Sequence, residues 1–421
     1  MSGAQSPPPT TTRRVLTRRG VMWIGQTCNQ RCYFCYFLDR IKDARHPEHA
    51  FLELGKLRDM ARILREFYGC CAVDIQGGEP TIYPDIIALV AYCREIGLHP
   101  TLITNGIHLA KPGELEQYPP AGLRDFLVSL HGIGAVHDEV VGKPGAFDKI
   151  TTAIGRMRDL GIPFRFNCTM SKPVVPLLAE VARQAIAYGA RAVNYIAFNP
   201  FEDQEAGIRT HENVPRYSAI KPRLTEALDR LEEAGIECNV RYLPLCMAEP
   251  RHRKNFYNFQ QLSYDLHEWD YQSWMWTGMP PQRMREGALM PTLRIGPFDH
   301  AIMARHTAAR DWALRHPALA RAVFGAQHAL ARIEQGLRGK DVLYREEAAF
   351  RAREDCGYTQ NAVCGRCAAR RICDGFHGDY AEFYGMDEAE AMTDTPPIHD
   401  PAFFICHQQK IVDAEDQSWA L

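Results

Sequence analysis

The chain has 421 residues, a length at which one hydrophobic core usually gives way to two or three lobes. Apolar residues make up 46% and charged residues 24%, an ordinary globular balance, and no apolar run approaches the ~18–20 residues that cross a bilayer. A net charge of −2 provides no overall field for nucleic acid or an acidic membrane. Intrinsic membrane proteins and wholly disordered chains are therefore excluded, and we expect neither a nucleic-acid nor a membrane partner.

The cysteine content is the feature of the composition that needs an explanation. The chain has 14 cysteines, well short of the ~8–10% found in small disulfide-stapled scaffolds. Residues 1–19 are rich in Pro, Thr and Ser and then basic, and they lack the apolar segment of a signal peptide, so we expect a disordered tail. A cytoplasmic, reducing location follows, in which clustered thiols bind metal more often than they pair.

From residue 20 onward, short β-branched or apolar runs alternate with segments of helical period, as in βα units around a parallel sheet. The predicted strands are Val21–Gly25, Ala72–Gln76, Pro100–Thr104, Phe126–Leu130, Phe164–Thr169, Ala192–Phe198 and Glu237–Tyr242. Apolar residues at three- and four-residue spacing from Phe147 to Leu160 predict one of the intervening helices. We expect an α/β fold, a partial (β/α)6-type TIM barrel, with a doubly wound open sheet as the alternative.

After Tyr242 the alternation of strands and helices ends. Phe256–Trp276 carries eight aromatic side chains, which indicates either a core-packing segment or a lid or pocket wall for an apolar or ring-shaped substrate. Residues 301–336 have the period of one or two long helices. We therefore divide the chain into a tail at 1–19, a barrel at 20–245 and a mostly helical C-terminal domain at 246–421.

The first cysteine group follows the first predicted strand directly. Cys28, Cys32 and Cys35 have the spacing Cys-x3-Cys-x2-Cys. Three thiolates on one short loop can bind three corners of a cubane iron–sulfur cluster and leave the fourth iron open for reaction. Structural zinc is the alternative, but it needs four ligands, and no further Cys or His follows before His46.

This triplet, with Phe34 before its last cysteine, resembles the fingerprint of the radical S-adenosylmethionine (radical SAM) superfamily. The resemblance implies a 4Fe-4S cluster whose open iron binds S-adenosylmethionine. It also implies reductive cleavage of that cofactor to a 5′-deoxyadenosyl radical, which abstracts a hydrogen atom from a substrate. The cofactor supplies the difficult chemistry, and the protein supplies position and exclusion of water.

Downstream residues extend the resemblance at successive strand ends. The cofactor-binding residues that it implies are Phe34, Gly77, Gly78, Glu79, Asn105, Ser129 and Asn167. Glycines permit close approach of the backbone, and Glu79 is expected to make a charge-assisted contact with the methionine ammonium group. Ser129 matches a position that contacts the methionine carboxylate, and Asn167 one that reaches the ribose or carboxylate. His131 and His137 could serve the substrate or proton transfer, or merely brace a loop.

The second cysteine group resembles the SPASM and twitch domains that hold auxiliary iron–sulfur clusters. The resemblance rests on the Cys-x2-Cys-x5-Cys spacing of Cys364, Cys367 and Cys373. With Cys246 at the end of the barrel, these cysteines are expected to hold one auxiliary 4Fe-4S cluster. Cys356 or Cys406 could replace Cys246, and zinc remains possible because four thiolates suit either metal. The remaining cysteines, expected to be buried in the core, are Cys70, Cys71, Cys93, Cys168 and Cys238.

The function predicted from these features is that of a radical SAM oxidoreductase or lyase. The first ~20 residues are too short for a folded leader-binding domain, which favours a small natural-product intermediate of sugar, aminocyclitol or nucleoside type. A peptide maturase that forms a crosslink or an epimer is the first alternative, and a non-catalytic zinc-binding protein is the second. The enzyme would need an external electron donor such as flavodoxin or ferredoxin. No catalytic acid or base is assigned.

Overall fold

The computed structural model describes residues 10–15, 19–46, 49–66, 70–198, 209–265, 315–339 and 357–413, with a few single residues between 342 and 353. Cys356, most of the predicted tail and the aromatic segment beyond residue 265 lie outside the described residues. No helix within the described ranges is both long and apolar enough to cross a bilayer.

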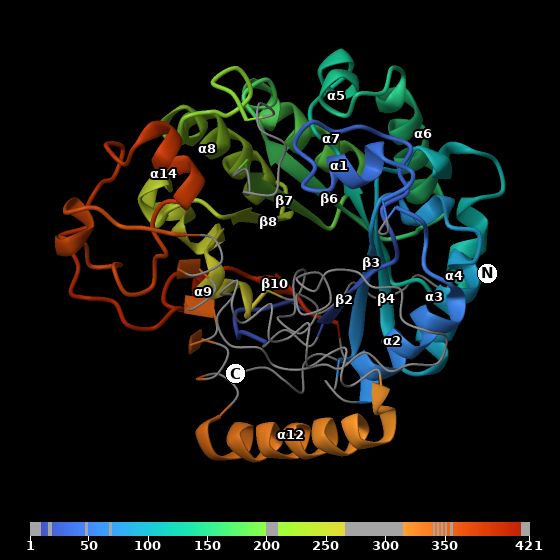
Figure 1. The fold of residues 1–421 in the computed structure, drawn as a ribbon. Helices are drawn as coiled ribbons and strands as arrows, with labels where there is room; N and C mark the ends of the chain where they lie inside the picture. The colour runs from blue at the N-terminus through green and yellow to red at the C-terminus, as the bar shows by residue number, and fades with distance from the viewer. Residues whose placement is uncertain are drawn as a thin grey trace.

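One curved parallel sheet forms the centre of the molecule, with helices on its outer face (Figure 1). Its strands, hydrogen-bonded in chain order, are β2 Arg19–Trp23, β3 Ala72–Gln76, β4 His99–Thr104, β5 Asp125–Ser129, β6 Phe164–Met170, β7 Ala192–Ala197, β8 Glu237–Arg241 and β9 Phe256–Tyr257. This sequential order is that of a partial barrel and differs from a doubly wound sheet, in which the order reverses. The predicted α/β partial barrel is confirmed.

The helices of the barrel lie between the strands in sequence. They are α1 Leu38–Lys42, α2 Leu54–Glu66, α3 Ile86–Glu95, α4 Tyr118–Ala121, α5 Ala135–Val140, α6 Ala146–Asp159, α7 Leu178–Tyr188 and α8 Tyr217–Glu233. Beyond the barrel lie α9 Phe259–Leu262, α12 Pro317–Arg338 and α14 Gly378–Tyr384. The helix predicted from the spacing of residues 147–160 is thus α6.

The first strand begins and ends two residues earlier than predicted. Gly25 has a φ of 127°, and a Cβ there would lie 2.5 Å from the carbonyl oxygen of Ala50. Only glycine allows this approach, and at this point the chain leaves the sheet for the loop that carries the first cysteines. The turn residue, rather than the apolar run, therefore sets the end of β2.

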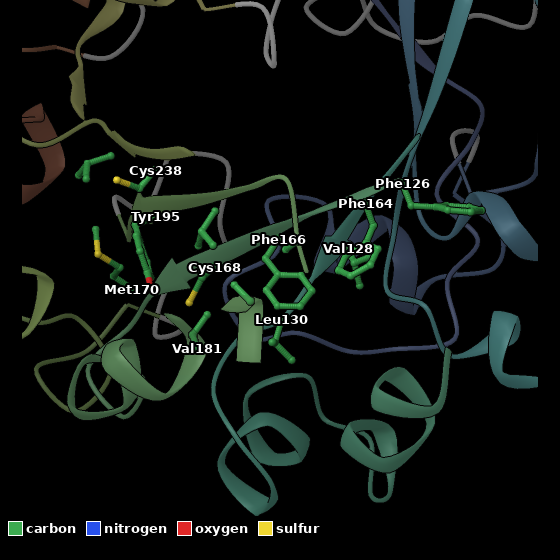
Figure 2. Close-up of a cluster of buried hydrophobic side chains, with 14 of the residues drawn as sticks. Phe126, Val128, Leu130, Phe164, Phe166, Cys168, Met170, Val181, Tyr195 and Cys238 are labelled. Atoms are coloured by element: carbon green, nitrogen blue, oxygen red, sulfur yellow. The ribbon is translucent and has the colours of Figure 1, made fainter. Parts of the chain in front are cut away.

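Alternate residues of each strand face the helices and the inside of the barrel. Phe126 and Val128 of β5 and Phe164, Phe166 and Cys168 of β6 pack together in the core (Figure 2). The residues between them face inward; Ser129 is the last residue of β5, and its register partner Asn167 lies three residues before the end of β6. All five cysteines predicted to lie in the core are buried.

Pairs of oppositely charged side chains lie inside the barrel, toward the amino-terminal ends of the strands. Arg19 donates to Asp74 at 2.5 Å, and the Arg165 Nε donates to Asp125 at 2.7 Å. All four side chains are nearly inaccessible to solvent. Because buried ions are tolerated only when they are paired, these pairs occupy the interior without leaving an unpartnered charge.

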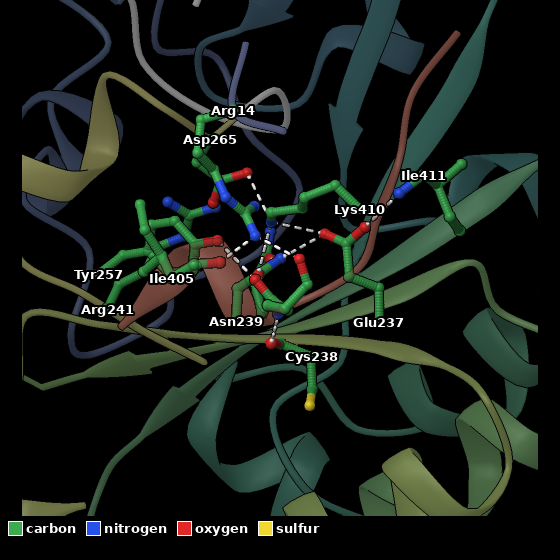
Figure 3. A network of polar contacts seen from close by, with 12 residues as sticks. Arg14, Glu237, Cys238, Asn239, Arg241, Tyr257, Asp265, Ile405, Lys410 and Ile411 are labelled. Carbon is green, nitrogen blue, oxygen red and sulfur yellow. Dashed lines mark hydrogen bonds and ion pairs between the residues drawn. The ribbon is translucent and has the colours of Figure 1, made fainter. Parts of the chain in front are cut away.

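Both ends of the described chain meet at the barrel. Thr10–Thr11 (β1) pairs antiparallel with Lys410–Ile411 (β10), although we expected a disordered tail there. Lys410 donates to Glu237 at 2.7 Å, to Asn239 at 2.8 Å and to Asp265 at 3.2 Å (Figure 3). Burial opposes the charge of Lys410, but the two carboxylates outweigh it and raise its pKa. The amino-acid composition of residues 1–19 did not indicate that Thr10–Thr11 pairs with β10.

Candidate functional site

The first cysteine group lies on the loop between β2 and α1. Cys28, Cys32 and Cys35 are half-buried, and the loop is held by a backbone hydrogen bond from Cys35 to Cys32 at 3.1 Å. Burial, and then the charge of Glu79, raises the pKa of Cys28 to about 12, and burial raises the pKa of Cys35 to about 11. The protein by itself therefore favours neutral thiols, and a bound cation would be needed to hold them as thiolates.

Two glycines let the loop after β3 dock against this cysteine loop. Gly78 N donates to the Gly25 carbonyl at 2.8 Å, and Glu79 N donates to the Thr27 carbonyl at 2.9 Å. A Cβ on Gly77 would lie 2.2 Å from the Gly25 oxygen, and one on Gly78 would lie 2.1 Å from the Thr27 oxygen. The glycines are thus required by backbone-to-backbone contact between the two loops.

Glu79 has a different position from the one that the resemblance implied. Its side chain is fully buried and lies outside the cavity described below. One carboxylate oxygen accepts from the Thr81 backbone N at 3.0 Å and from the Thr104 hydroxyl at 2.6 Å, and the other accepts from Asn105 N at 2.7 Å. In this structure the Glu79 side chain joins its own loop to the end of β4 through these protein donors.

A cavity opens at the carboxyl ends of the strands, next to the cysteine loop. Its space, including the part open to solvent, is about 1140 Å³. It is lined by all three cysteines and by the predicted residues Phe34, Gly77, Gly78, Asn105, Ser129 and Asn167. Folding therefore gathers every predicted cofactor residue except Glu79 around one space.

Some side chains in this lining carry buried polar atoms without a hydrogen-bond partner among the described residues. Among these atoms are Oδ1 of Asn167, Nε2 of Gln76 and Nε2 of Gln30. Buried polar atoms are rarely left unsatisfied, so a polar ligand in the cavity would complete them. The sequence analysis did not select Gln30 and Gln76, although one lies within the cysteine triplet and the other directly precedes the glycine pair.

The far wall of the cavity comes from the C-terminal part of the chain. Tyr242, Phe259, Tyr358 and His377 line it. Of the described part of the predicted aromatic segment, Phe259 faces the cavity, whereas Phe256, Tyr257 and Tyr264 are buried in the packing. Both interpretations of that segment therefore apply, each to different residues.

The two histidines considered for the site are placed differently. His131 lines the cavity, and its ring meets Phe34 edge-on with centroids 4.7 Å apart. His137 is fully buried outside the cavity, and its Nδ1 accepts from the backbone N of His131 at 3.1 Å. His137 thus braces the loop that carries His131.

The second cysteine group comes together from distant parts of the chain. Cys246 lies in a short 3-10 helix, Leu245–Met247, and Cys364 in another, Val363–Arg366. Burial, with smaller contributions from Cys364 and Cys367, raises the pKa of Cys246 to about 11, and burial, with a smaller contribution from Cys246, raises the pKa of Cys373. Cys246 thus interacts electrostatically with each of the other three cysteines. The Cys406 thiol instead donates to the Phe403 carbonyl.

Neither cysteine group has the geometry of a single-ion site. No three Cys, His, Asp or Glu side chains within the described ranges converge on a point where one metal ion could sit. Tetrahedral zinc requires all its thiolates about 2.3 Å from one centre. In a cubane cluster each thiolate binds a different iron, so the sulfurs stand further apart.

Comparison with known proteins gives a family for the first part of the chain. Residues 23–177 match the model of the Radical SAM superfamily. An AdoMet-dependent heme synthase of Methanosarcina barkeri is 33% identical over 127 residues, 30% of this chain and 36% of that protein. A PqqA peptide cyclase of Methylorubrum populi is 31% identical over 169 residues, 39% of this chain and 41% of that protein. The chain thus spans less than half of either relative.

Among solved structures, Streptococcus suis SuiB, crystallised with its precursor peptide SuiA, aligns with a TM-score of 0.44 and 18% identity. The alignment covers 54% of this chain and 49% of that one. A likeness at this level carries no inference about the substrate.

Proposed function

Because the chain belongs to the radical SAM superfamily, whose members use a 4Fe-4S cluster and S-adenosylmethionine, we propose that it abstracts a hydrogen atom from a substrate. When bound, the reduced cluster and its cofactor supply the 5′-deoxyadenosyl radical for that step. The observation that carries the proposal is that three thiols and the unsatisfied polar side chains of Gln30, Gln76 and Asn167 line one cavity.

Different residues of the chain would hold the cluster and S-adenosylmethionine. Cys28, Cys32 and Cys35 would bind the cluster, and Ser129 at the end of β5 and Asn167 within β6 would orient the methionine part of the cofactor. Gly77 and Gly78 fix the distance between the two loops.

The second cysteine group is proposed to hold one auxiliary 4Fe-4S cluster on Cys246, Cys364, Cys367 and Cys373. If this cluster takes an electron from the product radical, the net reaction is an oxidation and the enzyme is an oxidoreductase. If it does not, an elimination or rearrangement follows and the enzyme is a lyase. A flavodoxin or ferredoxin would supply the electrons, and such clusters fit a reducing, cytoplasmic location.

The proposed substrate is a small natural-product intermediate of sugar, aminocyclitol or nucleoside type. A peptide is the second candidate, favoured by the similarity to a peptide cyclase. Since the other relative named above is a heme synthase, similarity over the barrel alone does not select the substrate class.

Anaerobic reconstitution with iron and sulfide tests the proposal. The reconstituted protein should be brown and, with a reductant, should convert S-adenosylmethionine to 5′-deoxyadenosine, measured by liquid chromatography. A Cys28→Ala, Cys32→Ala, Cys35→Ala variant should lose this activity and keep about four irons at the second group. A colourless, zinc-loaded protein that forms no 5′-deoxyadenosine would contradict the proposal.

A further inference from the structure

The side-chain amide of Gln30 lies among the first cysteines and is only half satisfied. Gln30 is midway between Cys28 and Cys32 in the chain, is 3% exposed and lines the cavity. Its Oε1 accepts a hydrogen bond from the Cys32 thiol, with 3.5 Å between oxygen and sulfur, whereas its Nε2 has no partner among the described residues. A buried amide nitrogen without an acceptor is unfavourable and needs an explanation.

The contact between Gln30 and Cys32 depends on a proton that an iron ligand does not carry. A cysteine that binds iron is a thiolate, which can only accept hydrogen bonds. The carbonyl oxygen of Gln30 would then face a negatively charged sulfur, and the two acceptors would repel each other. The orientation of the amide in this structure therefore suits the free thiol and not the bound thiolate.

A half-turn of the amide about its last side-chain bond removes this repulsion. The two orientations occupy nearly the same volume, and the rotation is easy because the preference about this bond is broad and two-fold. Nε2 would take the place of Oε1 and donate to the Cys32 sulfur. Since Nε2 has no acceptor in the present orientation, the half-turn breaks no other hydrogen bond within the described residues.

The neighbouring sulfur of Cys28 already has donors of the same kind. The backbone N of Gln30 donates to it at 3.4 Å. The Asn105 Nδ2 lies 3.9 Å from it and also donates to Asn29 Oδ1 at 2.7 Å. Hydrogen bonds to the sulfurs favour the reduced, more negative state of an iron–sulfur cluster and so raise its reduction potential. The amide of Gln30 would extend these donors to a second ligand.

Resting on the proposed function, we infer that Gln30 donates a hydrogen bond from Nε2 to the Cys32 sulfur when the first cluster is bound, and thereby raises the reduction potential of that cluster. Gln30 acts through a ligand and not on the iron or the cofactor, so it is a positioning residue. A higher potential eases the transfer of one electron to the cluster from the external donor, a flavodoxin or ferredoxin.

Redox titration followed by electron paramagnetic resonance measures this potential in the reconstituted protein. The Cys28→Ala, Cys32→Ala, Cys35→Ala variant supplies the signal of the second cysteine group, which is subtracted. Gln30→Met keeps the length of the side chain and removes the amide, so the ratio of reduced to oxidised first cluster at a given potential should fall about three- to tenfold. For a one-electron couple this is a midpoint about 30–60 mV more negative.

Gln76→Met is the matched control. Gln76 is also a lining amide whose buried Nε2 has no partner, but its side chain bonds to no cysteine within the described ranges. Its midpoint should therefore equal that of the parent chain. Gln30→Leu removes the same amide with a side chain of different shape and should lower the midpoint as Gln30→Met does. It provides the measurement if Gln30→Met does not bind the cluster.

A midpoint in the Gln30 variants equal to that of the parent chain would overturn this role of Gln30. If S-adenosylmethionine then binds more weakly, the amide serves the cofactor instead. Loss of the first cluster from both variants would also overturn it, because Gln30 would then build the loop and not set the potential.

Formation of 5′-deoxyadenosine by the parent chain is measured separately. If it forms while the midpoints agree, the role of Gln30 fails and the proposed function stands. If the parent chain binds the cluster and forms none, the proposed function fails whatever the midpoints show. A parent chain that binds no cluster contradicts both.

Discussion

Gly78→Ala tests whether contact between the two strand-end loops builds the cofactor site. The new Cβ would lie 2.1 Å from the Thr27 carbonyl oxygen, whereas real Cβ contacts essentially never fall below 3.0 Å. The backbone fixes the position of the Cβ, and its partner is a backbone oxygen, so neither atom can rotate away. The loops must separate by at least 0.9 Å, the difference between these two distances.

The cost of that separation can be worked out from the contacts involved. The movement stretches two hydrogen bonds between the loops, at 2.8 and 2.9 Å, each contributing about 0.5–1.5 kcal/mol. Overpacking at a rigid site adds about 1–3 kcal/mol. Gly78→Ala should therefore lower the free energy of unfolding by about 2–6 kcal/mol. Because Thr27 precedes Cys28, the displacement also falls on the first cluster ligand.

Urea denaturation of the cluster-free chain measures the free energy, and iron analysis after anaerobic reconstitution measures the cluster. Gly78→Ala should contain about four fewer irons than the parent chain. The matched control is Gly55→Ala in α2, where a Cβ meets nothing within 4 Å and alanine should stabilise the helix by up to about 1 kcal/mol. If Gly78→Ala unfolds and loads iron like the control, the loop contact does not build the site.

Three further outcomes follow from the described contacts. Lys410→Met should lower the free energy of unfolding by about 3–5 kcal/mol, and adding Glu237→Gln should recover part of it, since one uncompensated carboxylate is then removed. Burial, opposed in part by Asp138, lowers the pKa of His137 from 6.5 to about 4. Because the unfolded chain then binds a proton more readily than the folded one, the free energy of unfolding should fall as the pH drops from 6.5 toward 4, by about 2 kcal/mol at pH 5. His137→Asn, which keeps an acceptor, should flatten that slope in urea titrations, and an unchanged slope would refute the assignment. Asn167→Leu should load the first cluster fully but bind S-adenosylmethionine more weakly in equilibrium titration, and unchanged affinity would show that its Oδ1 faces no cofactor.

The sequence by itself determined the features that depend on the spacing of residues close together in the chain. Cys28, Cys32 and Cys35 lie within eight residues, so their spacing alone fixes how they can meet a cluster. The alternation of strands and helices predicted the partial barrel, because side-chain period follows directly from backbone geometry. Since parallel strands end at the same edge, Ser129 and Asn167 could also be placed together in advance.

Only the tertiary structure decided which residues far apart in the sequence lie close together in space. It buries Glu79 among donors from its own loop and from the end of β4, a result that no local pattern reveals because Thr104 and Asn105 lie 25 and 26 residues further along the chain. It brings His377 and Tyr358 to a cavity built by strands more than 150 residues earlier, and it places Cys246 beside Cys364. The cofactor site could be predicted because its ligands are close in sequence. The substrate wall could not, because packing between distant segments creates it.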